Sequence, residues 1–185
     1  MKKIPTYFER DWSGDRSRVV NKIHDGCAWV SEGEGVATRK IDGTCCMVRG
    51  GKLYKRQEIK AGAATSVDFE QADFDKETGK RVGWRPVGDG PEDRWHREAF
   101  SGQCDGTYEL VGPKVQGNPD RHTAHLLIPH TIEALAFAQQ PPRDFDGLRD
   151  WLSGQDIEGV VFHHPDGRMA KIKLRDFRLK RVLAT

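Results

Sequence analysis

Apolar and polar residues alternate along much of this chain, and a period of two predicts β-strands. The clearest case is a pair of stretches, residues 44–49 and 52–59, which flank Gly50-Gly51 and predict a two-residue β-hairpin. A second hairpin is predicted around the turn His164-Pro165-Asp166-Gly167. Beyond the first hairpin, the predicted strands are residues 27–30, 36–40, 82–84, 107–111, 126–128, 157–162 and 169–174.

Helical signals are fewer. Residues 15–24, 131–140 and 144–152 are predicted to be helices, with Thr131 capping the second. Residues 60–106 are rich in Gly, Asp and Lys, and two interpretations stay open for most of this segment: a loop-rich substrate surface or lid, or a structural insertion held by its two tryptophans.

The composition fits one globular domain over residues 1–185, because this length supports one hydrophobic core and is short for two. Hydrophobic residues make up 36% of the chain and no apolar run approaches the roughly 20 residues that span a bilayer. Met1 is followed by no signal-peptide core, and the four cysteines form no C-x-x-C pair. We therefore expect a cytoplasmic protein in a reducing compartment, with no membrane partner and no obligate protein partner.

Two groups of residues suggest a metal site only weakly. Asp93, His96 and Glu98 have a spacing that fits no metal geometry. His122 and His125 have the H-x-x-H spacing, but no third ligand is placed to complete a zinc site. Structural or surface roles are favoured for these histidines.

The run Lys40-Ile41-Asp42-Gly43 combines an amine, a carboxylate and a residue without a side chain at the end of a predicted strand. A lysine attacks phosphorus only when its amine is neutral, so a nucleophilic role for Lys40 requires its pKa to be lowered by burial or by neighbouring cations. Asp42 could hold a ligand hydroxyl or a metal, and Gly43 could let the backbone approach a bound group. The alternative is a simple turn, since Asp-Gly is a common turn dipeptide.

Charged residues on two other predicted strands also indicate a ligand. Glu109 lies in the middle of residues 107–111, where a carboxylate is costly unless it has a partner; an exposed edge strand is the alternative. Lys171 and Lys173 should share one strand face, opposite Ile172, with ammonium groups about 7 Å apart. They repel each other unless an anion such as phosphate lies between them.

Net charge adds little, because 30 basic residues against 28 acidic ones give only +2. The distribution is more informative, since residues 171–181 read KIKLRDFRLKR and could neutralise phosphates along one face. A solvated chain end is the simpler interpretation of an isolated basic run.

Taken together, these motifs resemble the covalent nucleotidyltransferases, the superfamily of DNA ligases, RNA ligases and mRNA-capping guanylyltransferases. The order of the motifs is KIDG at 40–43, KR at 55–56, YEL at 108–110, EGVV at 158–161 and KIK at 171–173. The stretches ATRKIDGTCCMV and GWRPVGDGPEDRWHREAF further resemble the small 5′-to-3′ RNA ligases of the vertebrate type and their bacterial and viral relatives.

The resemblance implies catalytic roles for three lysines. Lys40 matches the lysine that attacks the α-phosphate of a nucleoside triphosphate, expelling pyrophosphate. Lys171 and Lys173 match the pair that contacts the α-phosphate and the leaving group, and Glu158 matches the acid that holds the metal or its waters. The implied cofactors are ATP and Mg²⁺, for which Mn²⁺ could substitute.

The resemblance implies binding roles as well. Glu109 matches the acid that binds the ribose hydroxyls, and Arg56 matches the basic residue that touches phosphate or the incoming RNA end. Asp42 and Gly43 belong to the nucleotide-binding motif. The predicted RNA-binding residues are Arg56, Arg175 and Arg178.

The implied fold is α+β, a single nucleotidyltransferase domain of the adenylyltransferase, ATP-grasp-like type, with antiparallel sheets flanking a nucleotide cleft. An OB-fold domain is not expected, because the chain ends twelve residues after Lys173. Arg39 stands where some phage RNA ligases have an acid, so the choice of adenine rests on the branch assignment. The expected activity is ATP-dependent joining of RNA 5′-phosphate and 3′-hydroxyl ends. The alternatives are a DNA-nick ligase, a GTP-dependent guanylyltransferase, or a noncatalytic RNA-end-binding module.

Overall fold

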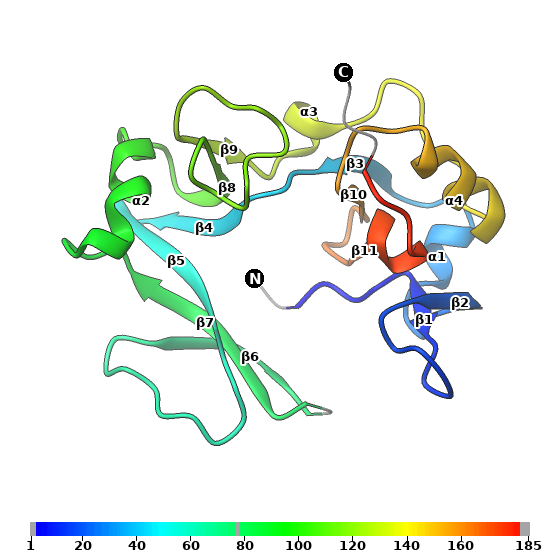
Figure 1. The fold of residues 1–185 in the computed structure, drawn as a ribbon, viewed down its shortest axis with the longest axis horizontal. Coiled ribbons are helices and arrows are strands. Elements are labelled where there is room, and N and C mark those ends of the chain that lie inside the picture. The colour runs from blue at the N-terminus through cyan, green and yellow to red at the C-terminus, as the bar shows by residue number, and fades with distance from the viewer. Residues whose placement is uncertain (1–2, 77, 182–185) are drawn as a thin grey trace. The chain divides into compact units, whose positions relative to one another are not determined.

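Antiparallel strands dominate the computed structural model, which describes residues 3–76 and 78–181 (Figure 1). With its few short helices, this is the sheet-rich mixture of α and β structure that the sequence predicts. The described residues form two units, here called the Glu109 unit (Lys3 and Asp42–His130) and the Lys40 unit (Ile4–Ile41 and residues 131–181). That residues 1–185 make one nucleotidyltransferase domain stays a prediction.

The Glu109 unit is built on a six-stranded antiparallel sheet with the order β6-β7-β5-β4-β8-β9. The predicted hairpin is confirmed, since β4 and β5 pair up to Arg49 and Lys52 and both Gly50 and Gly51 have positive φ. The elements of this unit are β4 (Thr44–Arg49), β5 (Lys52–Ile59), β6 (Glu70–Asp75), β7 (Lys80–Pro86), η1 (Pro91–Asp93), α2 (Arg94–Ala99), β8 (Gly106–Val111) and β9 (Leu126–Pro129).

Residues 60–106 contain more regular structure than the sequence predicts, because β6, β7, η1 and α2 alternate with loops in this segment. The two interpretations, a substrate surface or lid and a structural insertion, both stay predictions. The strand predicted at residues 82–84 is confirmed as part of β7, where Val82 and Trp84 are buried. Charged residues on β5 and β7 hid the pattern, because they pair with one another across the sheet, as Lys80 does with Glu58 at 2.7 Å.

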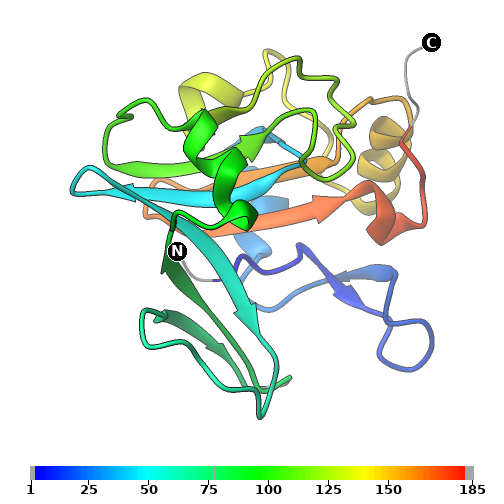
Figure 2. The same cartoon turned by 60° about the vertical axis from the view of Figure 1, so that its left-hand side comes forward.

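The Lys40 unit contains a three-stranded antiparallel sheet with the order β11-β10-β3. Figure 2 shows β10 and β11, in orange, running side by side. The elements of this unit are β1 (Phe8–Arg10), β2 (Val19–Ile23), α1 (Ala28–Ser31), β3 (Val36–Lys40), α3 (Ile132–Leu135), α4 (Phe145–Ser153), β10 (Gly159–His163), β11 (Met169–Lys173) and η2 (Leu174–Phe177).

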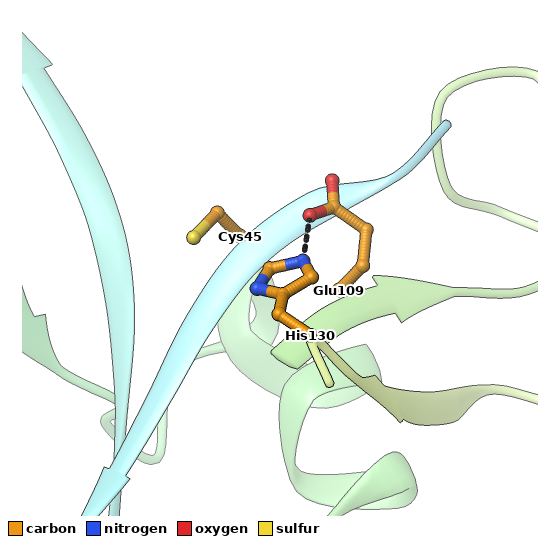
Figure 3. Close-up of side chains that lie close together, drawn as sticks. All are labelled: Cys45, Glu109 and His130. Carbon is orange, nitrogen blue, oxygen red and sulfur yellow. Dashed lines mark hydrogen bonds and ion pairs between the residues drawn. The ribbon is translucent and has the colours of Figure 1, made fainter. Parts of the chain in front are cut away.

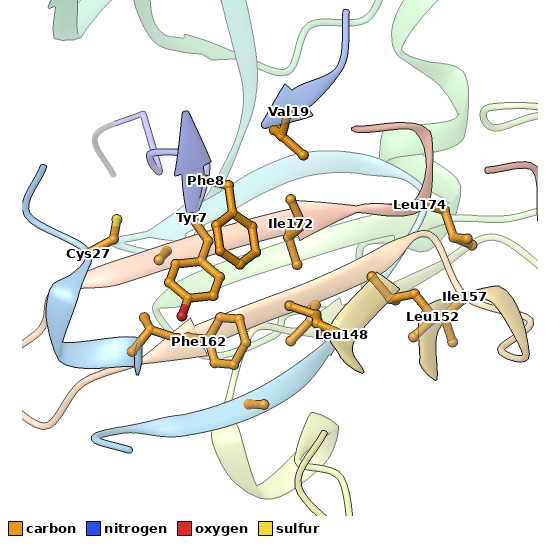
Figure 4. Close-up of a cluster of buried hydrophobic side chains, with 14 of the residues drawn as sticks. Tyr7, Phe8, Val19, Cys27, Leu148, Leu152, Ile157, Phe162, Ile172 and Leu174 are labelled. Atoms are coloured by element: carbon orange, nitrogen blue, oxygen red, sulfur yellow. The ribbon is translucent and has the colours of Figure 1, made fainter. Parts of the chain in front are cut away.

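One face of this sheet is covered by the hydrophobic core of the Lys40 unit (Figure 4). Phe162 on β10 and Ile172 on β11 are fully buried there, together with Leu148 and Leu152 one turn apart on α4. Because Ile172 enters the core, the residues before and after it on β11 point to the other face of the sheet. The alternation predicted for this strand is confirmed.

Two local predictions in the Lys40 unit are wrong. Residues 15–24 form no helix; instead β2 pairs with β1, where β-branched Val19 packs into the core. Residues 27–30 form no strand, because Ala28–Ser31 makes a single helical turn. A short apolar run does not distinguish the two structures by periodicity.

The two later helices are predicted with more success. Asp144 caps α4 by accepting a hydrogen bond from the Gly147 amide at 2.8 Å. Thr131 caps α3 as predicted, but this helix ends at Leu135 because Ala136 bridges to Thr38 on β3. No helix within the described ranges combines the length and the apolar character that crossing a membrane requires.

Candidate functional site

Sheet register brings Lys40 and Lys173 to the same residue of the central strand. Lys40, the last residue of β3, lies opposite Gly159 at the start of β10, and Gly159 also lies opposite Lys173 on β11. Residues that are directly opposite in neighbouring strands point to the same face of the sheet. The two lysines therefore flank Gly159 on the face that the hydrophobic core leaves open.

Glu158, the residue before this strand, joins the two lysines. Its Oε2 accepts a hydrogen bond from Lys40 Nζ at 2.5 Å, and its Oε1 accepts one from Lys173 Nζ. Burial alone would raise the pKa of the Glu158 carboxyl, but Lys40 and Lys173 together hold this pKa below its usual value. Glu158 is therefore a charged carboxylate at neutral pH, with both oxygens occupied by lysine.

Lys171 adds a third amine to this group, which we call the lysine cluster (Lys40, Lys171, Lys173 and Glu158). Burial, followed by the charges of Lys173 and Lys40, lowers the pKa of Lys171 to about 8. Among the described residues, none accepts a hydrogen bond from its Nζ. The cluster therefore contains three amines but a single carboxylate, which bonds to two of them, and such an excess of donors suits an anionic ligand.

Gly159 permits this arrangement, a role that the sequence analysis does not assign. A Cβ at this position would collide with the carbonyl oxygen of Ile172 and approach Lys173 Cα to 2.8 Å. Both obstacles are backbone or Cα atoms, so a flexible side chain cannot move away to relieve the contact. A side chain at residue 159 would therefore separate β10 from the strand that carries Lys173.

The KIDG motif spans the point where the chain passes from the Lys40 unit to the Glu109 unit, after Ile41. In the Glu109 unit, Asp42 and Gly43 precede β4. A Cβ on Gly43 would collide with the carbonyl oxygen of Leu110 and come within 2.8 Å of Glu109 Cγ. Packing against β8 therefore requires glycine here, and the predicted nucleotide contact of Gly43 stays a prediction.

Glu109 is buried on β8, with 7% of the residue exposed, and its partner is His130. A hydrogen bond of 2.9 Å joins Glu109 Oε2 to His130 Nε2. Cys45 on β4 lies directly opposite Glu109, and Figure 3 shows the three side chains close together. The need for a partner is predicted from the sequence, but His130 is missed because it follows the predicted strand 126–128 rather than lying within it.

The two basic residues in the middle of β5, Lys55 and Arg56, have different partners. Lys55 forms an ion pair with buried Asp93, which also accepts a hydrogen bond from the Gly88 amide at 2.8 Å. Arg56 lies over the ring of Trp84, with its Cζ 5.8 Å from the ring centroid. Asp93 thus anchors the loop before α2 to β5 inside the Glu109 unit.

The remaining predicted residues are placed as follows. His125 stacks on Trp95, with ring centroids 4.4 Å apart, and its Nδ1 lies 2.8 Å from Glu98 Oε1. Arg175 is exposed on η2, and Arg178, also exposed, donates a hydrogen bond to Asp15. The RNA contacts predicted for the two arginines stay predictions.

The geometry of the lysine cluster, with more amines than carboxylates, therefore suits an anionic group such as a phosphate. Comparison with known proteins then shows which family the chain is similar to. The model of the RNA ligase 1 family matches residues 98–182, a range that contains Glu109, Glu158 and the two lysines of β11 but lies beyond Lys40.

Individual relatives agree with the family model. The chain is 33% identical to RNA ligase 1 of Danio rerio over 82 residues, which is 40% of this chain and 25% of the relative. It is 38% identical to RNA ligase 1 of Pongo abelii over 74 residues, or 36% of this chain and 22% of the relative. A longer match to RNA ligase 1 of Rattus norvegicus covers 74% of this chain and 65% of the relative at 24% identity.

These matches confirm the resemblance to RNA ligases that the motifs indicate. The matched regions span about a quarter of the first two relatives and less than two thirds of the rat protein.

Proposed function

We propose that this chain is an ATP-dependent RNA ligase that joins RNA 5′-phosphate and 3′-hydroxyl ends through a lysyl-AMP intermediate. The observation that carries the proposal is the lysine cluster, in which Glu158 joins Lys40 to Lys173 with Lys171 beside them. Phosphoryl transfer depends on positioning and on charge stabilisation more than on acid-base chemistry, and lysines around one carboxylate supply both.

In the first step, Lys40 Nζ loses a proton and attacks the α-phosphorus of ATP. A P–N bond forms, the bond to the β-phosphate oxygen breaks, and pyrophosphate leaves. Lys171 and Lys173 stabilise the negative charge on the phosphoryl oxygens and on the leaving group. Glu158 accepts hydrogen bonds from both Lys40 and Lys173. A phosphate that draws Lys173 away from Glu158 would therefore also change the charge around Lys40, the nucleophile.

In the next two steps the nucleotide passes to RNA. A 5′-phosphate oxygen of the RNA attacks the lysyl-AMP, Lys40 recovers its amine, and the RNA carries AMP on its 5′ end. The 3′-hydroxyl of a second RNA end then attacks this 5′-phosphate, a phosphodiester forms, and AMP leaves. Arg56, Arg175 and Arg178 are the residues we assign to RNA phosphates, and Glu109 is assigned to the ribose of the nucleotide.

Magnesium fits the lysine cluster only in part. Mg²⁺ in phosphate sites is commonly held by one or two carboxylates together with substrate oxygens and water, and Glu158 supplies a single carboxylate. Glu158 would hold the ion or its waters, with the phosphates of ATP completing the set. When bound, Mg²⁺ would neutralise charge on the phosphates.

The direct test is to incubate the full chain with Mg²⁺ and either ATP or GTP, and then to measure its intact mass. Pyrophosphate treatment beforehand removes any nucleotide already attached. We expect one AMP increment from ATP, none from GTP, and its release on addition of RNA with a 5′-phosphate and a 3′-hydroxyl. A folded, nucleotide-free chain that gains no increment from either nucleotide would overturn the proposal in favour of a noncatalytic RNA-end-binding module.

A further inference from the structure

The cluster Cys45, Glu109 and His130 offers a sulfur, a carboxylate oxygen and an imidazole nitrogen, which all lie within 4.8 Å of one another. Within the described ranges this is the one group of three such side chains close enough to hold a metal ion together. We propose that these three residues form a zinc site, here called the thiolate cluster.

Sheet geometry builds the thiolate cluster from three neighbouring strands. Cys45 on β4 lies directly opposite Glu109 on β8, and Glu109 lies opposite Ile128 on β9. His130 follows β9, and its backbone amide donates a hydrogen bond to the carbonyl of Thr107 at 3.0 Å. The backbone of all three ligands is therefore held by the same hydrogen-bonded sheet, which makes the group preorganised rather than a chance approach of loop side chains.

The distances suit a small ion after a modest adjustment. Zinc bonds of about 2.0–2.3 Å to nitrogen, oxygen and sulfur place tetrahedral ligand atoms roughly 3.5 Å apart. The longest separation here, up to 4.8 Å, must close by about 1 Å, and the 2.9 Å hydrogen bond between Glu109 and His130 must open slightly. Rotation of the side chains on a fixed backbone provides movements of this size.

Two further observations favour a ligand at this place. His130 Nδ1 is buried, and no described residue forms a hydrogen bond with it, so this edge of the ring is left without a polar partner. The Glu109 side chain retains 10% of its exposed area and the His130 side chain 21%, so an ion can reach the cluster from solvent. A buried polar nitrogen without a partner is costly, and an ion bound at Nδ1 would remove that cost.

Ligand chemistry selects the metal. Thiolate with imidazole is a set that zinc prefers, whereas magnesium and calcium require oxygen ligands. Three protein ligands leave one tetrahedral position for water or another ligand. On binding, the Cys45 thiol loses its proton to solvent and a metal–sulfur bond forms, with no change of oxidation state.

This site goes beyond the proposed function, in which Glu109 is assigned to the ribose of ATP. Zinc bound to Glu109 would occupy that carboxylate, so the metal and the nucleotide would compete for it. The test below contains no nucleotide, and its failure therefore leaves the RNA ligase proposal untouched.

The experiment titrates the reduced full chain with Co²⁺, a spectroscopic substitute for zinc, and then displaces it with Zn²⁺ while millimolar Mg²⁺ is present. We expect one equivalent to bind, with a thiolate-to-cobalt absorption band in the near ultraviolet that Zn²⁺ removes and Mg²⁺ does not. Cys45→Ser should abolish the band and weaken Zn²⁺ binding at least tenfold, measured by competition with a chromogenic chelator.

The other ligands and the controls use matched substitutions. His130→Gln keeps a hydrogen-bond donor for Glu109 but removes the imidazole, and it should weaken Zn²⁺ binding to a similar extent. Cys104→Ser and His122→Gln, which change residues outside the thiolate cluster, should bind as the wild type does. Absence of stoichiometric binding by the wild type, or unchanged binding by folded Cys45→Ser, would overturn the zinc site.

Discussion

Each of the two units holds a carboxylate at a sheet, buried for Glu109 and partly buried for Glu158, and the two carboxylates have opposite surroundings. Glu158 in the Lys40 unit is hydrogen-bonded by two lysines, with a third amine close enough to be affected by their charges. Glu109 in the Glu109 unit meets a histidine and a cysteine instead. The first arrangement has an excess of positive charge and attracts anions, whereas the second offers lone pairs and attracts a cation. The residues on or just after the neighbouring strands, rather than the carboxylate itself, therefore determine whether each group attracts an anion or a cation.

The largest effect is expected from replacing the proposed nucleophile. Lys40→Ala should reduce nucleotide attachment by more than about a thousandfold, because no other group forms the P–N bond. Lys40→Arg should be equally inactive, although it keeps a cation beside Glu158, since a guanidinium stays protonated. Intact mass after incubation with ATP measures both, and circular dichroism checks that they are folded. Full attachment to either variant would transfer the role to another residue of the lysine cluster.

The next largest effect is expected at Glu158. Glu158→Gln removes the charge that both lysines share, and we expect nucleotide attachment to slow by about a hundredfold. Loss of one partner from this partly buried pair should also lower the free energy of unfolding by about 1–3 kcal/mol. Quenched-flow labelling and urea denaturation measure the two effects. Unchanged attachment with reduced stability would make Glu158 a structural residue only.

Glu109→Gln should have a smaller effect of a different kind. We expect the ATP concentration at half-maximal rate to rise by about tenfold while the maximal rate changes little, because this residue is assigned to binding rather than to the reacting phosphorus. The side-chain amide keeps a hydrogen-bond acceptor for His130. A large fall in the maximal rate with unchanged apparent affinity would place Glu109 in the chemical step and remove the contrast between the two carboxylates.

A last effect, on stability and not on nucleotide attachment, is a pH dependence from Lys171, whose pKa falls from 10.5 in the unfolded chain to about 8 in the folded one. Between these values the unfolded chain binds more protons, so stability from this group rises with pH, by at most about 1.4 kcal/mol per pH unit. Lys171→Met removes the titration. Urea unfolding from pH 7 to 10.5 should show the wild type gaining stability relative to this variant, and parallel curves would contradict the lowered pKa.

Local patterns in the sequence predict the elements that carry the site better than they predict the site itself. The hairpin at Gly50-Gly51 and the alternation around Ile172 are confirmed, because turn chemistry and a period of two are encoded over a few residues. Residues 15–24 fail as a helix because pairing with β1, a contact between separate segments, decides their structure.

The same distinction applies to the functional residues. Glu158 and the lysines of β11 are predicted as site residues from the sequence through charges at unusual strand positions and through the family resemblance, and their roles stay predictions. That Lys40 and Lys173 both lie opposite Gly159 depends on strand order and register, which no local pattern specifies. The thiolate cluster is missed for this reason too, since Cys45, Glu109 and His130 come from three separate parts of the sequence.

In the proposed reaction Lys40, rather than another amine of the lysine cluster, carries the nucleotide. This assignment is tested most directly by incubating the wild type with ATP and Mg²⁺, digesting the product and locating the attached AMP by tandem mass spectrometry. Cleavage after Arg39 and after Arg168 places Lys40 in a different peptide from Lys171 and Lys173, and fragment ions distinguish the last two. We predict AMP on Lys40 alone. AMP on Lys171, the amine whose pKa is lowered to about 8, would contradict the account and make that residue the nucleophile.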